Sequence, residues 1–312
     1  MTSDANPRRR LPEGARISRW SAADGWPLRL LEWEAAVERP RGTILFQGGR
    51  GDMLEKYLES FGRWHAEGWT VGGFDWRGQG GSGRLNPARP CGHIQDFAAF
   101  VADLRGFWSD WVARTPGPHV VIGHSMGGHL ILRAMVEGAI APATAVLVAP
   151  MLGLRAPISA AVGEGYARLI ASIGDDSRPA WKTNEKPYTL TARRKLLTHD
   201  EARYADELWW HKHDPALFTG PPSWRWLAQA FESTRALGKD PRLATLDTPV
   251  LMLVAEADQL VDPAAALAVA ARLPRAKVVR FGAESAHEIL READPVRERA
   301  LAEIDAFLQA HA

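Results

Sequence analysis

The feature that most constrains this chain is the segment His119–Gly128, which reads HVVIGHSMGG. Its β-branched first half is typical of a buried parallel strand, and after Ser125 apolar residues recur at helical spacing until Gly138. A strand, a Gly-x-Ser-x-Gly turn and a helix in this order form a nucleophile elbow, which lifts the serine hydroxyl above the sheet. The turn requires Gly123 and Gly127, because a side chain at either position collides with its neighbours. The segment therefore predicts that Ser125 is a nucleophile.

Composition and charge exclude several other classes of protein. The chain has 312 residues, of which 46% are hydrophobic, and a net charge of +1, which argues for a sizeable core and against a dedicated nucleic-acid binder. Its single cysteine, Cys91, excludes an intrachain disulfide framework and favours a reducing, cytoplasmic location. No apolar segment follows the basic residues 8–10, so we expect neither a signal peptide nor a membrane anchor. These arginines predict a solvated tail, with transient contact to a membrane surface as the alternative.

Strands and helices alternate along most of the chain. The pattern predicts a hairpin over residues 16–36 and further strands over 42–46, 69–75, 119–122, 144–149, 249–254 and 277–281. This alternation predicts an α/β fold, with a mostly parallel sheet and helices on both of its faces. Residues 151–246 show only helical patterns, so we expect a core of residues 1–150 and 247–312 with a helical cap inserted between two strands. Such a cap would hang over the elbow, where open α/β sheets place their sites.

The serine needs two partners further along the chain. A base must take its proton, and a carboxylate must fix the tautomer of that base. In this architecture the order is serine, acid, histidine, each after a strand. Asp258 follows the strand that ends near residue 255 and is the predicted acid, with Asp262 and Glu256 as alternatives. His287 follows the last strand and is the predicted base, so Ser125, Asp258 and His287 form the candidate triad.

Two backbone amides should stabilise the oxyanion that forms during attack. The first is the N–H group of Met126, which directly follows the nucleophile. The second should come from the loop after the strand at 42–46, where Gly49 is the first candidate and Arg50 the next. A plain glycine turn is the alternative interpretation of this loop.

Other candidate residues concern the substrate pocket and possible ligands. Arg50 and His124 are expected to line the pocket. Four tryptophans either line an apolar acyl pocket or belong to ordinary helix packing, namely Trp209, Trp210, Trp224 and Trp226. His211 and His213 have metal-ligand spacing but stand alone, so we predict no metal site. The glycine-rich loop at 78–83 has neither the ending of a phosphate loop nor a dinucleotide fingerprint, so we expect no cofactor.

Three motifs together resemble one known family. They read DWRGQGGSG at 75–83, GHSMGG at 123–128, and EADQLVD at 256–262 followed by His287. They resemble the α/β-hydrolases of the monoacylglycerol lipase and lysophospholipase group, the serine aminopeptidase S33-like hydrolases. The stretches 197–204 and 220–226 are similar to the lysophospholipase L2 branch in particular. The family usually has His-Gly where this chain has Gln47 and Gly48, a difference that bears on the oxyanion loop.

The resemblance implies an eight-stranded sheet, a helical lid and hydrolysis of a carboxylic ester. The substrate would be a lipid with a single acyl chain, either a lysophospholipid or a monoacylglycerol. Two alternatives stay open at this point, because one fold hosts many chemistries. The same machinery could cleave a non-lipid ester or an amide, as an esterase or aminopeptidase does. The chain could also be a non-catalytic binding protein that retains the fold.

Overall fold

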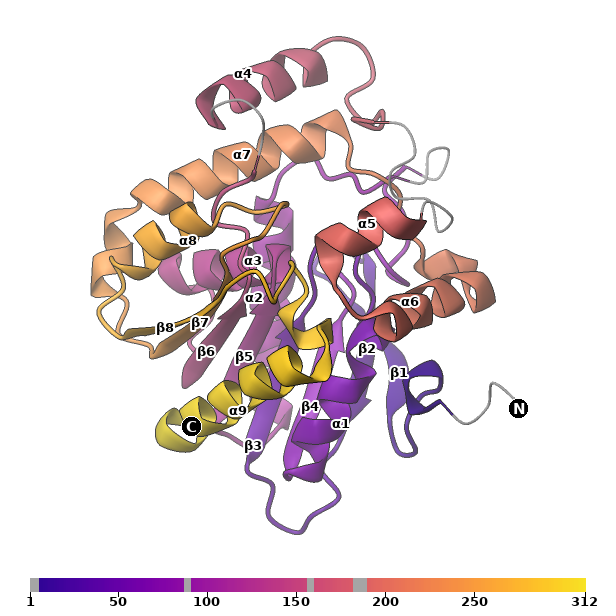
Figure 1. Ribbon diagram of the computed structural model, residues 1–312, viewed down its shortest axis with the longest axis vertical. Helices are drawn as coiled ribbons and strands as arrows, with labels where there is room; N and C mark the ends of the chain where they lie inside the picture. Colours follow the sequence, from indigo (N-terminus) through magenta and orange to yellow (C-terminus); the bar gives the residue numbers. More distant parts are fainter. Residues whose placement is uncertain (1–5, 87–90, 156–159, 182–189) are drawn as a thin grey trace.

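The computed structural model describes residues 6–86, 91–155, 160–181 and 190–312, and one eight-stranded sheet runs through it (Figure 1). The strands lie in the order β1-β2-β4-β3-β5-β6-β7-β8. Pairing is antiparallel from β1 to β2 and from β2 to β4, and parallel from β4 to β8. Both the predicted α/β class and the implied eight strands are confirmed. The strand bounds are Arg16–Ser21, Pro27–Trp33, Gly42–Gln47, Trp69–Phe74, His119–His124, Thr144–Val148, Val250–Ala255 and Ala276–Phe281 for β1 to β8.

Helices cover both faces of this sheet. Helices α1 (Leu58–Ala66) and α9 (Asp294–His311) pack on one face, and α2 (Ala98–Arg114), α3 (Met126–Val136) and α8 (Pro263–Ala270) on the other (Figure 1). Every residue of β3, β4, β6 and β7 is buried, as expected for parallel strands covered on both sides. This burial explains why these segments are mostly apolar and do not alternate between apolar and polar residues.

The described residues between β6 and β7 contain helices but no strand, apart from isolated bridges at Leu154, Pro179, Pro222 and Ser223. Two of these helices begin at side-chain caps, where Asp200 accepts a hydrogen bond from Arg203 N and Ser223 accepts one from Trp226 N. In Figure 1, α4, α5 and α7 lie beyond the end of the sheet at which β5 runs into α3. The division of the chain into a core and a cap stays a prediction. The helices are α4 (Ala160–Ala171), α5 (Leu190–Leu197), α6 (Glu201–His213) and α7 (Trp224–Lys239), with short 3₁₀ turns at Pro215–Leu217 and Pro241–Thr245.

The N-terminal segment corrects one expectation. The predicted tail is not solvated at Arg8 and Arg9, because both guanidinium groups pair with Asp206 on α6, the second at 2.6 Å. Trp210 of the same helix donates its indole N–H to the carbonyl of Arg8 at 2.9 Å. The sequence pattern could not reveal this contact, because it joins residues about two hundred positions apart. The part of the prediction that concerns residues 1–5 lies outside the described residues.

The described segments contain no helix that is long and apolar enough to cross a membrane.

Candidate active site

Ser125 lies in the strained turn that the sequence predicts. Its backbone has φ of +52° and ψ of −117°, a region that residues with side chains rarely adopt. A Cβ atom on Gly123 would lie 2.7 Å from Gly128 N, and one on Gly127 would lie 2.2 Å from the carbonyl oxygen of Gln47. Both glycines are therefore required by close backbone contacts, and the predicted elbow geometry is confirmed.

Three side chains from distant parts of the sequence form one hydrogen-bonded line. His287 Nε2 lies 2.9 Å from Ser125 Oγ, and His287 Nδ1 lies 2.6 Å from Asp258 Oδ2. The other oxygen of Asp258 accepts the backbone N–H groups of Leu260 and Val261 at 2.7 and 3.1 Å. A carboxylate on Nδ1 fixes the tautomer in which Nε2 is free to accept the serine proton.

The two alternative acids lie elsewhere. Asp262 caps α8 by accepting the backbone N–H of Ala264 at 2.9 Å. Glu256 is exposed and lies 3.4 Å from Arg280. Asp258 is therefore the carboxylate that the fold brings to His287.

The electrostatics of the line favour an imidazole that accepts a proton readily. Burial lowers the pKa of His287, but the charge of Asp258 and its hydrogen bond outweigh burial, so the pKa is raised above 6.5. Burial raises the pKa of Asp258, but the opposite effect of His287 and the two backbone N–H groups is larger. The pKa is therefore lowered, and this carboxyl stays ionised. The negative charge of Asp258 thus lies next to His287, the base that would gain positive charge when it accepts the serine proton.

The first predicted oxyanion donor lies at the start of a helix. Met126 is the first residue of α3, and the first amides of a helix have no acceptor within the helix. They also lie at the positive end of the helix dipole. The Met126 N–H group is therefore suited to a negative charge that develops next to Ser125.

The second predicted oxyanion donor, Gly49, forms a different hydrogen bond from the one expected. Gly49 does lie against the nucleophile, because a Cβ atom there would be 3.0 Å from Ser125 Cβ. However, its N–H group donates to Asp52 Oδ2 at 2.6 Å, whereas the prediction directs it toward the oxyanion. A carboxylate three residues later in the same loop takes this hydrogen bond, and the sequence reasoning did not consider it. Arg50, the second candidate, lines the cavity in front of Ser125.

Gln47 and Gly48 stand where the family usually has His-Gly, at the end of β3 and the start of the loop that contains Asp52. Gln47 is fully buried, and its side-chain amide has no hydrogen-bond partner among the residues that the structure describes. The neighbouring Gly48 carbonyl accepts the indole N–H of Trp76 at 2.9 Å. The 75–83 motif therefore supports this loop through Trp76, whereas the Gln47 side chain does not hold it by hydrogen bonds.

A mostly apolar cavity of about 540 Å³ opens in front of the triad. Of the six residues predicted to line it, Arg50, His124, Trp224 and Trp226 do so. Trp209 and Trp210 do not. Trp209 stacks on His213 with ring centroids 3.7 Å apart, and Trp210 contacts the N-terminal segment. The sequence reasoning missed most of the apolar and aromatic lining residues between β6 and β7, among them Tyr166, Trp181, Leu196 and Phe231.

The two histidines of α6 that have metal-ligand spacing differ in burial. Its side chain is buried on α6, and burial lowers its pKa to about 4. His213, two residues on, is exposed and stacks on Trp209. The described part of the chain holds no group of three or more side chains that could ligate a metal ion.

Comparison with known proteins places this site in a family. The family model described as serine aminopeptidase, S33, matches residues 38–294, a span that contains the whole candidate triad. The chain belongs to the serine aminopeptidase S33 family. It is 29% identical to lysophospholipase L2 of Escherichia coli (strain K12), over 94% of this chain and 87% of that protein. It is 24% identical to a monoacylglycerol lipase of Mycolicibacterium smegmatis, over 87% and 89% of the two chains.

Solved structures agree with the fold of this S33-family chain. A soluble variant of monoglyceride lipase from Saccharomyces cerevisiae, in complex with a substrate analog, superposes with a TM-score of 0.78 at 18% identity. The superposition covers 100% of this chain and 99% of the yeast one. At this identity, the likeness shows the fold alone.

Proposed function

We propose that this chain is a serine hydrolase that cleaves the carboxylic ester of lipids with a single acyl chain. The observation that carries the proposal is the hydrogen-bonded line from Asp258 through His287 to Ser125, beside an apolar cavity. The two curated relatives compared above, a lysophospholipase and a monoacylglycerol lipase, support an ester of this class.

In the proposed reaction, His287 Nε2 takes the proton of Ser125 Oγ as that oxygen attacks the ester carbonyl. The Met126 N–H group stabilises the resulting oxyanion, and Asp258 stabilises the imidazolium. His287 then gives its proton to the leaving alcohol. A water molecule, activated by the same histidine, releases the fatty acid from the acyl-enzyme. The chain's own side chains and amides suffice for every step, so the proposal includes no cofactor.

Within this class, the cavity favours a lysophospholipid over a monoacylglycerol. Its apolar walls from α4, α7 and Trp181 suit an acyl chain. Arg50 and Arg155 line the same cavity, and Arg155 donates to the backbone carbonyl of Asp258 at 3.0 Å, directly behind the triad. Guanidinium groups bind phosphate more strongly than they bind a neutral glycerol. A phosphate-bearing headgroup therefore matches these two cationic residues of the cavity lining.

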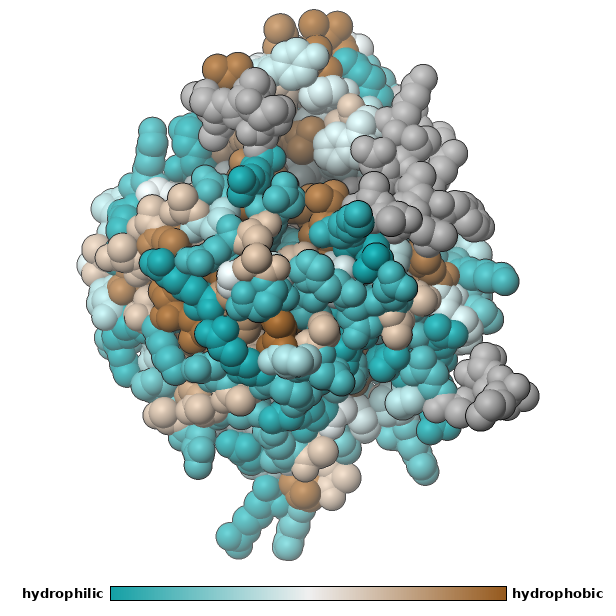
Figure 2. All heavy atoms as spheres, in the orientation of Figure 1, coloured by the Kyte–Doolittle hydropathy of each residue, from teal (hydrophilic) through white to brown (hydrophobic). Residues whose placement is uncertain are grey.

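An exposed apolar stripe supports contact with a lipid surface. Tyr166 and Leu169 of α4 and Ile173 just after it are 53%, 57% and 56% exposed. They recur at helical spacing, and Tyr166 also lines the cavity. In Figure 2, several hydrophobic residues lie among more hydrophilic ones at the end of the molecule that α4 occupies. We therefore propose that the α4 stripe contacts the membrane or micelle from which the substrate enters.

Replacement of the nucleophile tests the proposed function. Ser125→Ala should lower the release of fatty acid from a long-chain lysophospholipid by about 10⁴-fold or more, because the covalent intermediate can no longer form. The variant should also lose labelling by a fluorophosphonate probe. Ser60→Ala, at a buried serine of α1, is the matched control and should keep both properties. Near-normal ester turnover by Ser125→Ala would sink the proposal.

A panel of substrates separates the alternatives. We expect turnover of lysophospholipid to exceed that of monoacylglycerol, of short p-nitrophenyl esters and of aminoacyl p-nitroanilides. Preference for the aminoacyl compounds would instead identify an aminopeptidase. A folded wild-type protein that neither labels with fluorophosphonate nor turns over any ester would identify a binding protein.

A further inference from the structure

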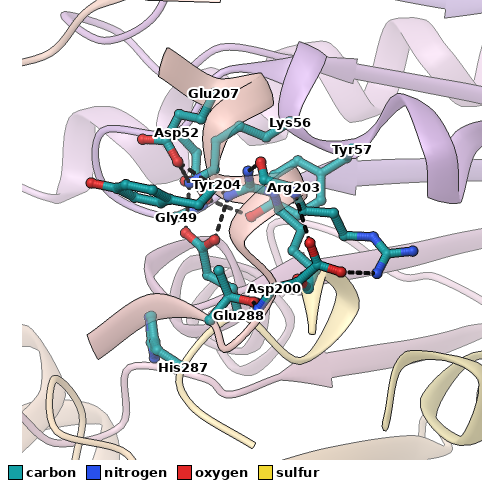
Figure 3. A network of polar contacts seen from close by, with 12 residues as sticks. Gly49, Asp52, Lys56, Tyr57, Asp200, Arg203, Tyr204, Glu207, His287 and Glu288 are labelled. Carbon is teal, nitrogen blue, oxygen red and sulfur yellow. Dashed lines mark hydrogen bonds and ion pairs between the residues drawn. The ribbon is translucent and has the colours of Figure 1, made fainter. Parts of the chain in front are cut away.

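A cluster of buried charges lies beside the triad and plays no part in the reaction proposed above. We define the buried ion cluster as the three carboxylates and three cations of Asp52, Lys56, Arg193, Glu207, Glu288 and Arg291. Lys56 is its centre, and the ammonium is 1% exposed. Lys56 Nζ pairs with Asp52, with Glu288 at 2.6 Å and with Glu207 at 3.3 Å (Figure 3). These carboxylates belong to three segments that are distant in the sequence.

The first carboxylate holds the loop that lies against the nucleophile. Asp52 accepts the Gly49 N–H group at 2.6 Å and the hydroxyl of Tyr57 at 2.6 Å. It also lies 3.1 Å from Nδ1 of His124, the residue that precedes Ser125. The position of Asp52 therefore sets the position of the Gly49 backbone beside the serine.

The second carboxylate holds the base. Glu288 directly follows His287, and its backbone N–H donates to Leu197 O at 2.8 Å. Its side chain also pairs with Arg291. Because Lys56 binds the Glu288 carboxylate, the ammonium limits how far the His287 loop can move relative to the loop of Gly49.

The third carboxylate brings in the helices between β6 and β7. Glu207 lies on α6, where it pairs with Arg291 at 3.1 Å and with Arg193 at 2.8 Å. Helix α5 ends at Leu197, whose carbonyl accepts the Glu288 N–H group. Helices α5 and α6 are thus attached to the loop that carries the base.

The charges in this cluster persist despite their burial. Burial lowers the pKa of Lys56, but the carboxylates of Asp52, Glu207 and Glu288 outweigh burial and hold the pKa above its ordinary value. Burial likewise raises the pKa of Glu207, but the charges of Arg193, Lys56 and Arg291 hold it well below its ordinary value. Removing such charges from water is costly, and well-packed apolar residues often stabilise a fold equally well. Each ion pair of this cluster has a preferred distance and direction, so the cluster constrains the relative positions of the segments that it joins.

We propose that Lys56 is a positioning residue of this hydrolase, whose ammonium fixes the Gly49 loop, the His287 loop and helix α6 relative to one another. The inference rests on the proposed function, since it concerns the geometry of that site. Lys56 acts through Asp52 and Glu288: it is among the residues that line the cavity, but its ammonium is 1% exposed and pairs with carboxylates, not with Ser125 or His287. Misplacement of an attacking or stabilising group by about 1 Å costs on the order of 10²-fold in rate, so small movements of these loops are sufficient for a large effect.

The test compares three variants, with every rate expressed per serine that reacts with a fluorophosphonate. Lys56→Met removes the charge at similar volume, and we expect kcat on a soluble ester to fall about 10- to 100-fold with KM changed less than threefold. Lys56→Arg restores a cation and should recover part of the loss. Arg77→Met is the matched control, because Arg77 pairs with Asp103 at 2.7 Å and with Asp24, away from the triad. It should lower the melting temperature but keep kcat per reactive serine.

Hydrogen exchange adds a readout that does not depend on turnover. Lys56→Met should increase exchange at the backbone amides of 286–292, and Arg77→Met should not. Should Lys56→Met fail to fold, Glu207→Gln removes one carboxylate charge without changing its size. It should increase exchange in the same peptide and lower kcat several-fold.

Two outcomes overturn the inference, and they differ from failure of the proposed function. If Lys56→Met keeps the wild-type kcat per reactive serine, the cluster has only a structural role. If Lys56→Met does not fold, wild-type kcat in Glu207→Gln leads to the same conclusion. A loss in Lys56→Met that Arg77→Met reproduces has the same meaning. A wild-type protein without ester turnover or serine labelling rejects the proposed function, and this inference with it.

Discussion

Asp258 controls how the base titrates. His287 must be neutral to accept a proton, and its pKa is raised above 6.5 because the carboxylate outweighs the effect of burial. The value of kcat/KM should therefore be low in acid and rise to a plateau, with a midpoint above pH 6.5. In Asp258→Asn this midpoint should move to lower pH, because burial then acts without the opposing charge. The plateau should also fall about 10⁴-fold, since the amide favours the wrong tautomer.

The pH profile has a matched control in a carboxylate close to Asp258 in sequence. Glu256 is exposed and lies apart from the triad, so Glu256→Gln should leave both the midpoint and the plateau unchanged. A shift of the midpoint in Glu256→Gln, with none in Asp258→Asn, would reassign the acid.

Individual residues differed in how far the sequence could predict them. Chain order and strand ends sufficed to place Ser125, Asp258 and His287 together, because each follows a strand whose end meets the same edge of the sheet. The contact of Lys56 with Glu288 joins residues 232 positions apart and has no local pattern. The engagement of Gly49 by Asp52 was local but depended on side-chain direction, which a motif does not specify.

At the scale of elements, the elbow is the joint between β5, α3 and the loop after β3. A Cβ atom on Gly127 would lie 2.2 Å from the Gln47 carbonyl oxygen and 2.5 Å from that of Gly48, so Gly127→Ala must displace this loop. We expect the free energy of unfolding to fall by about 2–4 kcal/mol, together with a loss of ester turnover. Denaturant unfolding and the rate per reactive serine measure the two effects.

Gly238 provides the matched comparison on α7. A Cβ atom there meets nothing within 4 Å, so Gly238→Ala should raise the free energy of unfolding by about 0.5–1 kcal/mol through helix propensity. Equal effects of the two substitutions would mean that the close approach at Gly127 does not constrain the elbow.

The sequence predicted where helices and strands lie better than it predicted what each face of a helix contacts. Mostly apolar runs located β3, β5, β6 and β7 to within a residue or two, because strands buried on both sides carry few polar side chains. The tryptophans of α6 were assigned to the pocket by residue type, yet Trp210 faces the N-terminal segment. No residue of α6 lines the cavity, and this helix instead forms long-range ion pairs through Asp206 and Glu207, which a local pattern does not reveal.

At the scale of the whole molecule, the helices between β6 and β7 differ in what they contact. Helix α6 is attached to the catalytic loops through Glu207, whereas α4 packs on α7 and exposes apolar side chains. This asymmetry suits an enzyme whose base stays fixed while its substrate enters from a lipid surface past Tyr166.

The α4 stripe can be tested by placing charges on it. Leu169→Glu combined with Ile173→Glu should lower hydrolysis of long-chain lysophospholipid in micelles or vesicles by about tenfold or more, since burying one such side chain contributes about 1.5–3 kcal/mol. Turnover of a short soluble ester should stay unchanged, because neither side chain lines the cavity. Val112→Glu, at an exposed valine of α2, is the matched control and should leave both activities intact. Equal losses on aggregated and soluble substrates would show that the stripe supports the fold of the cap and does not contact lipid.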